Sequence, residues 1–228
     1  MKNFIVGFII ATIATGASYA AAFNFGWITE ADWLEAASVF ASYICTYLCV
    51  VESRWNYPVG FVATALLCTF FWQGQLYSSA ALNFYLPIAL LYGWWRWGPD
   101  RQTRPVTWLG KDKLWFAYAA WSIGVWLILY QISNYFNAPQ ALADSAILGL
   151  SVMAQLLLDN KRIETWAFWA AGNIIAIPHY WTSGYKILAL QFVFFLANTC
   201  YGYYMWQKSM KKEPIVEFVG ENVEATNA

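Results

Sequence analysis

Long apolar stretches alternate with short polar or charged segments along the chain. In the first hundred residues the apolar stretches are residues 4–23, residues 33–51 and a longer uncharged run between Arg54 and Arg96. That run is too long for one membrane span, and the polar, glycine-containing segment 72–79 predicts a turn that divides it into two helices. Because a spanning helix requires about 20 mostly apolar residues, these stretches predict four transmembrane helices.

Four further stretches follow the same pattern. They predict a helix that begins after Lys113 and ends near residues 134–139, and then helices over residues 139–158, 165–185 and 187–207. The composition agrees, since 60% of the 228 residues are apolar and 11% are charged, whereas soluble domains carry about 25% charged residues. The sequence therefore predicts an all-α integral membrane protein with eight transmembrane helices.

Net charge and the rarer residue types exclude several classes of function. The 13 basic and 13 acidic side chains balance, which removes the electrostatic case for a nucleic-acid partner. One histidine and four cysteines without a CxxC pair provide neither a pattern of metal ligands nor a disulfide framework. We therefore expect no metal site, no cofactor and no catalytic residues.

The distribution of lysine and arginine predicts the orientation in the membrane. Twelve of the 13 lie on one side of the predicted spans, and Lys186 alone lies on the other. Because basic loops remain in the cytoplasm, both termini are expected there.

The first stretch also has the basic start and small final residues of a secretory signal. We expect it to be retained, because its apolar stretch is long for a signal. Cleavage would leave seven helices and an external N-terminus. The polar segment 213–228 is predicted to be disordered.

A repeated motif relates the two halves of the chain. YGWWRW at 92–97 and YGYYMW at 201–206 lie 109 residues apart, and the same offset brings predicted helices two to four into register with helices six to eight. The repeats begin an even number of helices apart, so both cross the membrane in the same direction, as in transporters that bind substrate between parallel repeats. The predicted domains are an extra N-terminal helix (1–30), a first three-helix repeat (31–98), a cytoplasmic loop and linker helix (99–138), a second repeat (139–208) and a cytoplasmic tail (209–228).

Trp166, Trp169 and Asn173 form the strongest candidate site. Their spacing of i, i+3 and i+7 places them on one face of the seventh predicted helix, with the amide near the middle of the span. Two tryptophan faces below an amide can hold a flat aromatic ring, and a cationic ring gains cation–π attraction. Asn83 and Gln191 are further candidate amides. The alternative interpretation is packing, with an asparagine that bonds to a neighbouring helix.

The same segments carry a resemblance to a known family. RIETWAFWAAGN (162–173) with the later YGYYMW, and RWNYPVG (54–60) with YGWWRW, resemble the Pnu vitamin transporters over residues 36–208. The resemblance assigns the family's substrate motif WxxWxxxN to the two tryptophans and the asparagine of the candidate site. In the first half of the chain, the family pattern N-W-x-x-G falls on Asn56, Tyr57 and Gly60, with Tyr57 where tryptophan is usual. A family glutamine falls on Asn83. The resemblance assigns substrate-binding roles to these four residues.

The resemblance implies a fold and a function. The fold is SWEET-like, with 3+1+3 parallel repeats and one extra N-terminal helix, assembled as a homotrimer in the lipid bilayer of a bacterial inner membrane. The function is import of nicotinamide riboside by facilitated diffusion, followed by trapping through a cytosolic kinase. Thiamine, also a delocalised cation, is the close alternative, and riboflavin is the third.

The residues themselves favour a carrier over other mechanisms. The interiors of the predicted spans contain essentially no Asp, Glu, Lys or Arg, and proton-coupled transporters usually keep an ionisable relay there. A membrane enzyme is disfavoured because His179 has no carboxylate partner in its own helix. A sensor is disfavoured because the C-terminal tail is too short to form an output domain.

Overall fold

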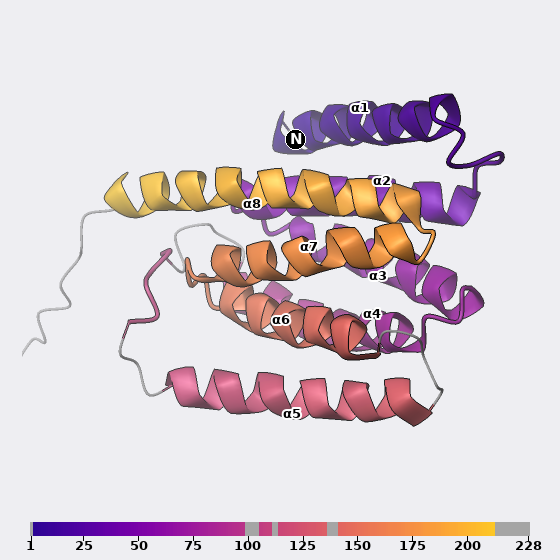
Figure 1. The fold of residues 1–228 in the computed structure, drawn as a ribbon. Helices are drawn as coiled ribbons and strands as arrows, with labels where there is room; N and C mark the ends of the chain where they lie inside the picture. Colours follow the sequence, from indigo (N-terminus) through magenta and orange to yellow (C-terminus); the bar gives the residue numbers. More distant parts are fainter. Residues whose placement is uncertain (1, 99–104, 111–113, 136–140, 213–228) are drawn as a thin grey trace, which may run out of the picture.

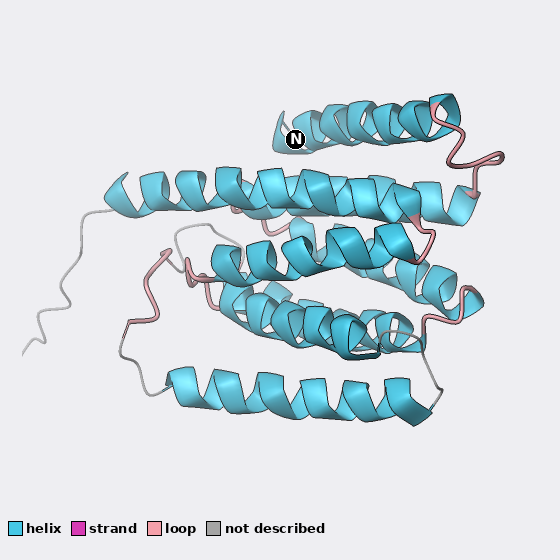
Figure 2. Cartoon of the chain, in the orientation of Figure 1, coloured by secondary structure: helices cyan, strands magenta, loops and turns pink. Residues whose placement is uncertain are grey.

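The computed structural model describes residues 2–98, 105–110, 114–135 and 141–212. Within these residues it contains eight α-helices, as predicted, and its one β-type pairing is an isolated bridge between Thr107 and Arg162. The helices are α1 (Lys2–Asn24), α2 (Trp33–Val50), α3 (Asn56–Gln73), α4 (Tyr77–Trp97), α5 (Leu114–Tyr135), α6 (Ala141–Asp159), α7 (Thr165–Thr182) and α8 (Lys186–Lys212). They run side by side along one direction (Figures 1 and 2).

Five of the helices in the described part of the chain, α1, α2, α5, α6 and α8, are long and apolar enough to cross a membrane by length and mean hydropathy. The other three, α3, α4 and α7, have at least 18 residues and lie alongside them (Figure 1), which corresponds to about 27 Å or more of helix. Their mean hydropathy is lowered by tryptophan, tyrosine, asparagine and proline, and several of these residues face the interior of the bundle.

Six helices form a closed ring. Helices α2, α3 and α4 pack in sequence, as do α6, α7 and α8, and the two sets meet where α4 packs on α6 and where α8 packs on α2. Each set is one of the predicted repeats. The 109-residue offset fits the helix bounds closely, since residues 56–73 of α3 map onto residues 165–182 of α7.

The two remaining helices lie outside the ring in equivalent places. Helix α1 packs on α2 and α8, and α5 packs on α6 and α4; Figure 1 shows them on opposite sides of the bundle. Exchanging the two repeats converts the first set of contacts into the second. The helix that was predicted as an extra N-terminal element and the helix that was predicted as a linker are therefore counterparts, so each half of the molecule has four helices.

Contacts at one end of the ring repeat this symmetry in detail. The indole of Trp97 donates to the carbonyl of Leu158 at 3.1 Å, and its counterpart Trp206 donates to the carbonyl of Cys49 at 3.2 Å. Nearby, the ammonium of Lys161 pairs with the carboxylate of Glu52 at 3.1 Å. These two residues also correspond by the offset, and both adopt a positive φ just after a helix, of 49° and 53°. Paired contacts between the repeats therefore close this end of the ring.

Some predicted boundaries shift in the structure. The turn between α3 and α4 occupies residues 74–76, a shorter segment than the predicted 72–79. Helix α8 extends to Lys212, beyond the residue at which the tail was predicted to begin. The segment 213–228, predicted to be disordered, lies outside the described residues. Pro87 and Pro178 lie inside α4 and α7, and each helix continues past its proline.

Candidate transport site

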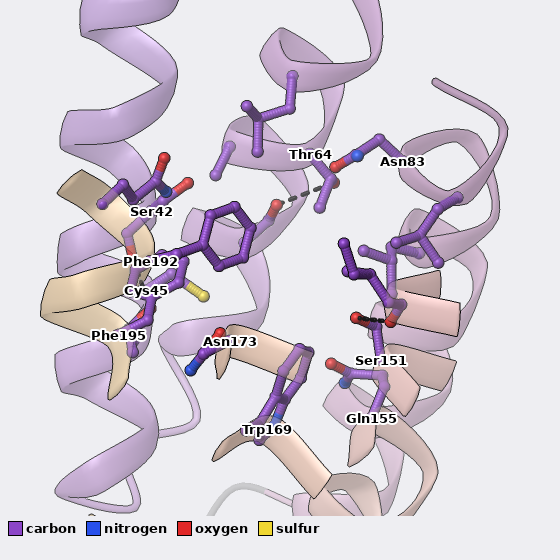
Figure 3. Close-up of a pocket in the computed structure, with 18 of the residues that line it drawn as sticks. Ser42, Cys45, Thr64, Asn83, Ser151, Gln155, Trp169, Asn173, Phe192 and Phe195 are labelled. Atoms are coloured by element: carbon purple, nitrogen blue, oxygen red, sulfur yellow. Dashed lines mark hydrogen bonds between the residues drawn. The ribbon is translucent and has the colours of Figure 1, made fainter. Parts of the chain in front are cut away.

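The ring of six helices surrounds an internal cavity of about 190 Å³. Every helix of the ring contributes to its wall, and neither α1 nor α5 does. Figure 3 shows side chains from both repeats around this space. The polar and aromatic residues in the wall are Ser42, Thr46, Asn56, Thr64, Phe71, Ser79, Asn83, Ser151, Gln155, Trp166, Trp169, Asn173, Tyr180, Gln191, Phe192, Phe195 and Thr199. Seven of the eight predicted site residues, all except Tyr57, line the cavity.

Trp166 and Trp169 both face the cavity from α7, but their surroundings differ. Trp166 is 3% exposed and packs edge-on against Trp206, with ring centroids 5.3 Å apart. Its ring also lies directly over Gly202 of α8, where a side chain would overlap the indole. Trp169 is less buried and projects into the space between Asn173 and Gln155 (Figure 3). Trp166 is therefore held by packing within the protein, whereas the ring of Trp169 is available to a ligand.

Four residues of the wall carry buried polar atoms that have no hydrogen-bond partner among the residues that the structure describes. They are the side-chain nitrogen atoms of Asn173 and Trp166 and the side-chain oxygen atoms of Gln191 and Asn56. Buried polar groups in proteins are almost always paired, so each unpaired group requires a partner from water or a ligand. Two donors and two acceptors around one cavity suit a ligand that has both kinds of group.

The first repeat supplies the opposite part of the wall. Gly60 of α3 is buried and lines the cavity, and the hydroxyl of Thr64, one turn later, donates to the Gly60 carbonyl at 2.9 Å. Asn83 of α4 donates from its amide to the carbonyl of Ser79 at 2.8 Å. By the 109-residue offset, Gly60 corresponds to Trp169 and Thr64 corresponds to Asn173. The cavity thus has one side that carries the ring of Trp169 and one side where Gly60 leaves space.

Tyr57 does not line the cavity. Its ring lies over Gly93, its hydroxyl donates to the carboxylate of Asp159 at 3.1 Å, and Trp97 packs edge-on against it at 5.3 Å. This arrangement repeats the packing of Trp166 on Gly202. Tyr57 occupies the position equivalent to Trp166, and in this repeat the ring fills the space above the glycine.

Sequence reasoning missed several polar residues of the wall, among them Ser42, Ser151 and Gln155. The two serines correspond by the 109-residue offset. That correspondence supports the repeat, but it does not predict that either serine lines the cavity. Gln155 is 5% exposed, and its amide nitrogen donates to Asp159 at 2.7 Å. Its inward position follows from the packing of α6 between α4 and α7.

A buried polar cluster lies at the end of the cavity away from the Glu52–Lys161 pair. The hydroxyl of Ser79 donates to Asp144 at 2.9 Å and lies 3.2 Å from the hydroxyl of Tyr180. The imidazole of His179 is 3.7 Å from the same carboxylate. His179 has no carboxylate in its own helix, as the sequence indicates, but a carboxylate of α6 is its neighbour across the helix interface.

An internal cavity between two parallel three-helix repeats of a membrane protein is the architecture of a membrane transporter. The sequence profile described as "Nicotinamide mononucleotide transporter" matches residues 32–208. The chain belongs to this family.

Individual relatives agree with this assignment. The nicotinamide riboside transporter PnuC of Escherichia coli (strain K12) is 26% identical over 213 residues, which is 80% of this chain and 88% of that protein. The riboflavin/roseoflavin transporter RibM of Streptomyces davaonensis is 23% identical over 176 residues, 73% of this chain and 81% of that protein. The crystal structure of the vitamin B3 transporter PnuC matches with a TM-score of 0.72 at 18% identity, and covers 93% of this chain and 97% of that chain. The fold that the resemblance implied is therefore confirmed.

Proposed function

We propose that this protein imports nicotinamide riboside across the membrane. The observation that carries the proposal is the cavity between the repeats, where the ring of Trp169 and four unpaired polar atoms surround one space. The substrate has a flat cationic ring for the tryptophan face, and a carboxamide and ribose hydroxyls for the donors and acceptors. Relatives that share most of the chain carry the name of this activity.

The charge of the cavity wall favours the riboside over its phosphorylated form. None of the described residues that line the cavity is charged. A phosphate group would therefore be buried without a cationic partner, which is strongly unfavourable. The proposed substrate is the nucleoside, which carries one positive charge and no phosphate.

Binding titrations of the purified protein test the substrate. We expect nicotinamide riboside to bind, and nicotinamide mononucleotide to bind at least about tenfold more weakly because of its unpaired phosphate. Thiamine is the close alternative, since it also presents a delocalised cation, and riboflavin is the third because a relative is named for its transport. Tighter binding of thiamine, riboflavin or the mononucleotide than of the riboside would contradict the proposal.

We further propose that transport is facilitated diffusion with alternating access. Asp144 and His179 form the buried acid–base pair nearest the cavity, and they lie in the first turn of α6 and the last turn of α7. They are thus at one end of the spans and do not form a relay through them. Accumulation then depends on a cytosolic kinase that traps the substrate by phosphorylation.

Uptake into proteoliposomes tests this mechanism. Because the acid–base pair lies at one end only, uptake is expected to continue at an unchanged initial rate when ionophores collapse the proton and sodium gradients. The Asp144→Asn variant is a useful comparison, because it removes the acid of the pair. An ionophore that stops uptake by the unmodified protein, with Asp144→Asn insensitive to it, would identify proton coupling through this pair.

We also propose an orientation in the membrane and an oligomeric state for the protein. Of the basic residues that the structure describes, Lys186 alone lies at the end of the bundle opposite the start of α1 and the end of α8. By the positive-inside rule this supports cytoplasmic termini in a bacterial inner membrane. The homotrimer is proposed on the resemblance to the Pnu transporters.

A further inference from the structure

Asp159, the last residue of α6, is a fully buried carboxylate next to the cavity. One of its oxygen atoms, Oδ1, accepts hydrogen bonds from the hydroxyl of Tyr57 at 3.1 Å and from the amide of Gln155 at 2.7 Å. The other oxygen, Oδ2, is buried without a hydrogen-bond partner among the described residues. A carboxyl group buried without an opposite charge is favoured in its neutral form, and a cation brought next to it favours the ionised form. Binding of a cationic substrate and ionisation of Asp159 therefore support each other.

The cations nearest in sequence do not supply that compensation. Among the residues that the structure describes, none forms an ion pair with Asp159. The ammonium of Lys161 pairs with Glu52, and the guanidinium of Arg162 donates to Thr107 and to the carbonyl of Trp108. The C-terminal end of α6 also carries the negative end of the helix dipole, which adds to the field of the carboxylate.

Gln155 connects this carboxylate to the cavity. It lies one turn before Asp159 on α6 and lines the cavity beside Trp169 (Figure 3). Because its amide nitrogen is held by Asp159, the amide oxygen is the group left for a ligand. The carboxylate thus fixes the direction of the amide and presents a hydrogen-bond acceptor next to the aromatic face.

We propose that Asp159 makes the cavity selective for positively charged substrates, through its charge and through the orientation that it imposes on Gln155. This inference rests on the proposed function, since it concerns the same cavity. It assigns Asp159 a positioning and charge-selecting role without contact with the substrate. A cationic ring at Trp169 is attracted by the carboxylate, whereas an uncharged ring of the same shape is not.

Nicotinamide riboside and its reduced dihydro form test the proposal, because they differ by the ring charge and hardly in size. The wild-type protein is expected to bind the cationic form at least about tenfold more tightly. The Asp159→Asn variant keeps an acceptor for Tyr57 and Gln155 but loses the charge. It should bind the cation about tenfold more weakly and the reduced form within about twofold of wild type. Asp159→Glu should retain the preference for the cation.

Glu35→Gln is the matched control, because Glu35 is also a buried carboxylate but its side chain bonds to Tyr19, which does not line the cavity. The ratio of the affinities of Glu35→Gln for nicotinamide riboside and for its reduced form should equal that of wild type. An Asp159→Asn protein that weakens both ligands by the same factor would show a purely structural role and overturn the inference. Equal binding of both ligands by wild type would overturn it without any variant. Failure of wild type to bind nicotinamide riboside at all would instead contradict the proposed function.

Discussion

A tryptophan at position 60 is expected to abolish substrate binding in a protein that still folds and inserts. Gly60 lines the cavity from α3, and by the 109-residue offset it corresponds to Trp169 of the other repeat. An indole there would occupy a large part of a cavity of about 190 Å³. We expect affinity for nicotinamide riboside to fall at least about 100-fold in a binding titration, or about 2.7 kcal/mol.

Two control variants distinguish the effect of an indole ring in the cavity from the effect of crowding at position 60 and from that of an indole elsewhere in the protein. A β-carbon at position 60 would lie 3.0 Å from the sulfur of Cys45 and 3.4 Å from Leu90, so some loss of stability is expected from crowding alone. Gly60→Ala introduces the same β-carbon without the ring and should retain most of the affinity. Gly124→Trp adds an indole on α5, where a β-carbon meets nothing within 4 Å, and should bind normally. Normal affinity in a well-folded Gly60→Trp protein would place the pocket elsewhere.

The helices and their order could be predicted from the sequence because charges and turn residues bound the apolar stretches. Membrane spans have a nearly fixed length, so the long run between Arg54 and Arg96 had to be two helices. The motifs around Gly93 and Gly202 then gave the offset, and the helix bounds of both repeats agree with it. The equivalence of α1 and α5 was not predicted, because the repeated motifs lie in other helices; the 109-residue offset does bring α1 close to register with α5, and their packing makes the relation plain.

The residues of the cavity wall could be predicted where their position depends only on which face of one helix they occupy. Trp166, Trp169 and Asn173 face inward because their spacing puts them on one side of α7. Tyr57 does not line the cavity, because its ring lies over Gly93 of another helix and its hydroxyl donates to Asp159. The inward position of Gln155 and the proximity of Asp144 to His179 likewise depend on contacts between helices, and helical periodicity contains no information about those contacts.

Trp169→Ala is expected to lower affinity strongly without lowering stability. The ring of Trp169 projects into the cavity, so its loss removes both a stacking face and a cation–π contact from the ligand. Together these are worth about 2–3 kcal/mol, so affinity for nicotinamide riboside should fall about 30- to 150-fold. Trp169→Phe should recover part of this loss. Asn173→Leu should cost about 1–3 kcal/mol of binding, because a polar group of the substrate is left unpaired.

Trp166 provides the contrasting variant on the same helix face. Its ring packs on Gly202 and against Trp206, so Trp166→Ala leaves a void in the protein and should lower thermal stability as a large-to-small core substitution does, by about 3–5 kcal/mol. Thermal unfolding and binding titration therefore separate the two alanine variants. If Trp169 contacts the substrate, Trp169→Ala should lose affinity at wild-type stability, whereas Trp166→Ala should lose stability as well as the affinity contributed by its unpaired indole nitrogen. If Trp169 serves only packing, Trp169→Ala will resemble Trp166→Ala, with reduced stability and wild-type affinity in the protein that remains folded. That pattern would remove the basis for placing the substrate in this cavity.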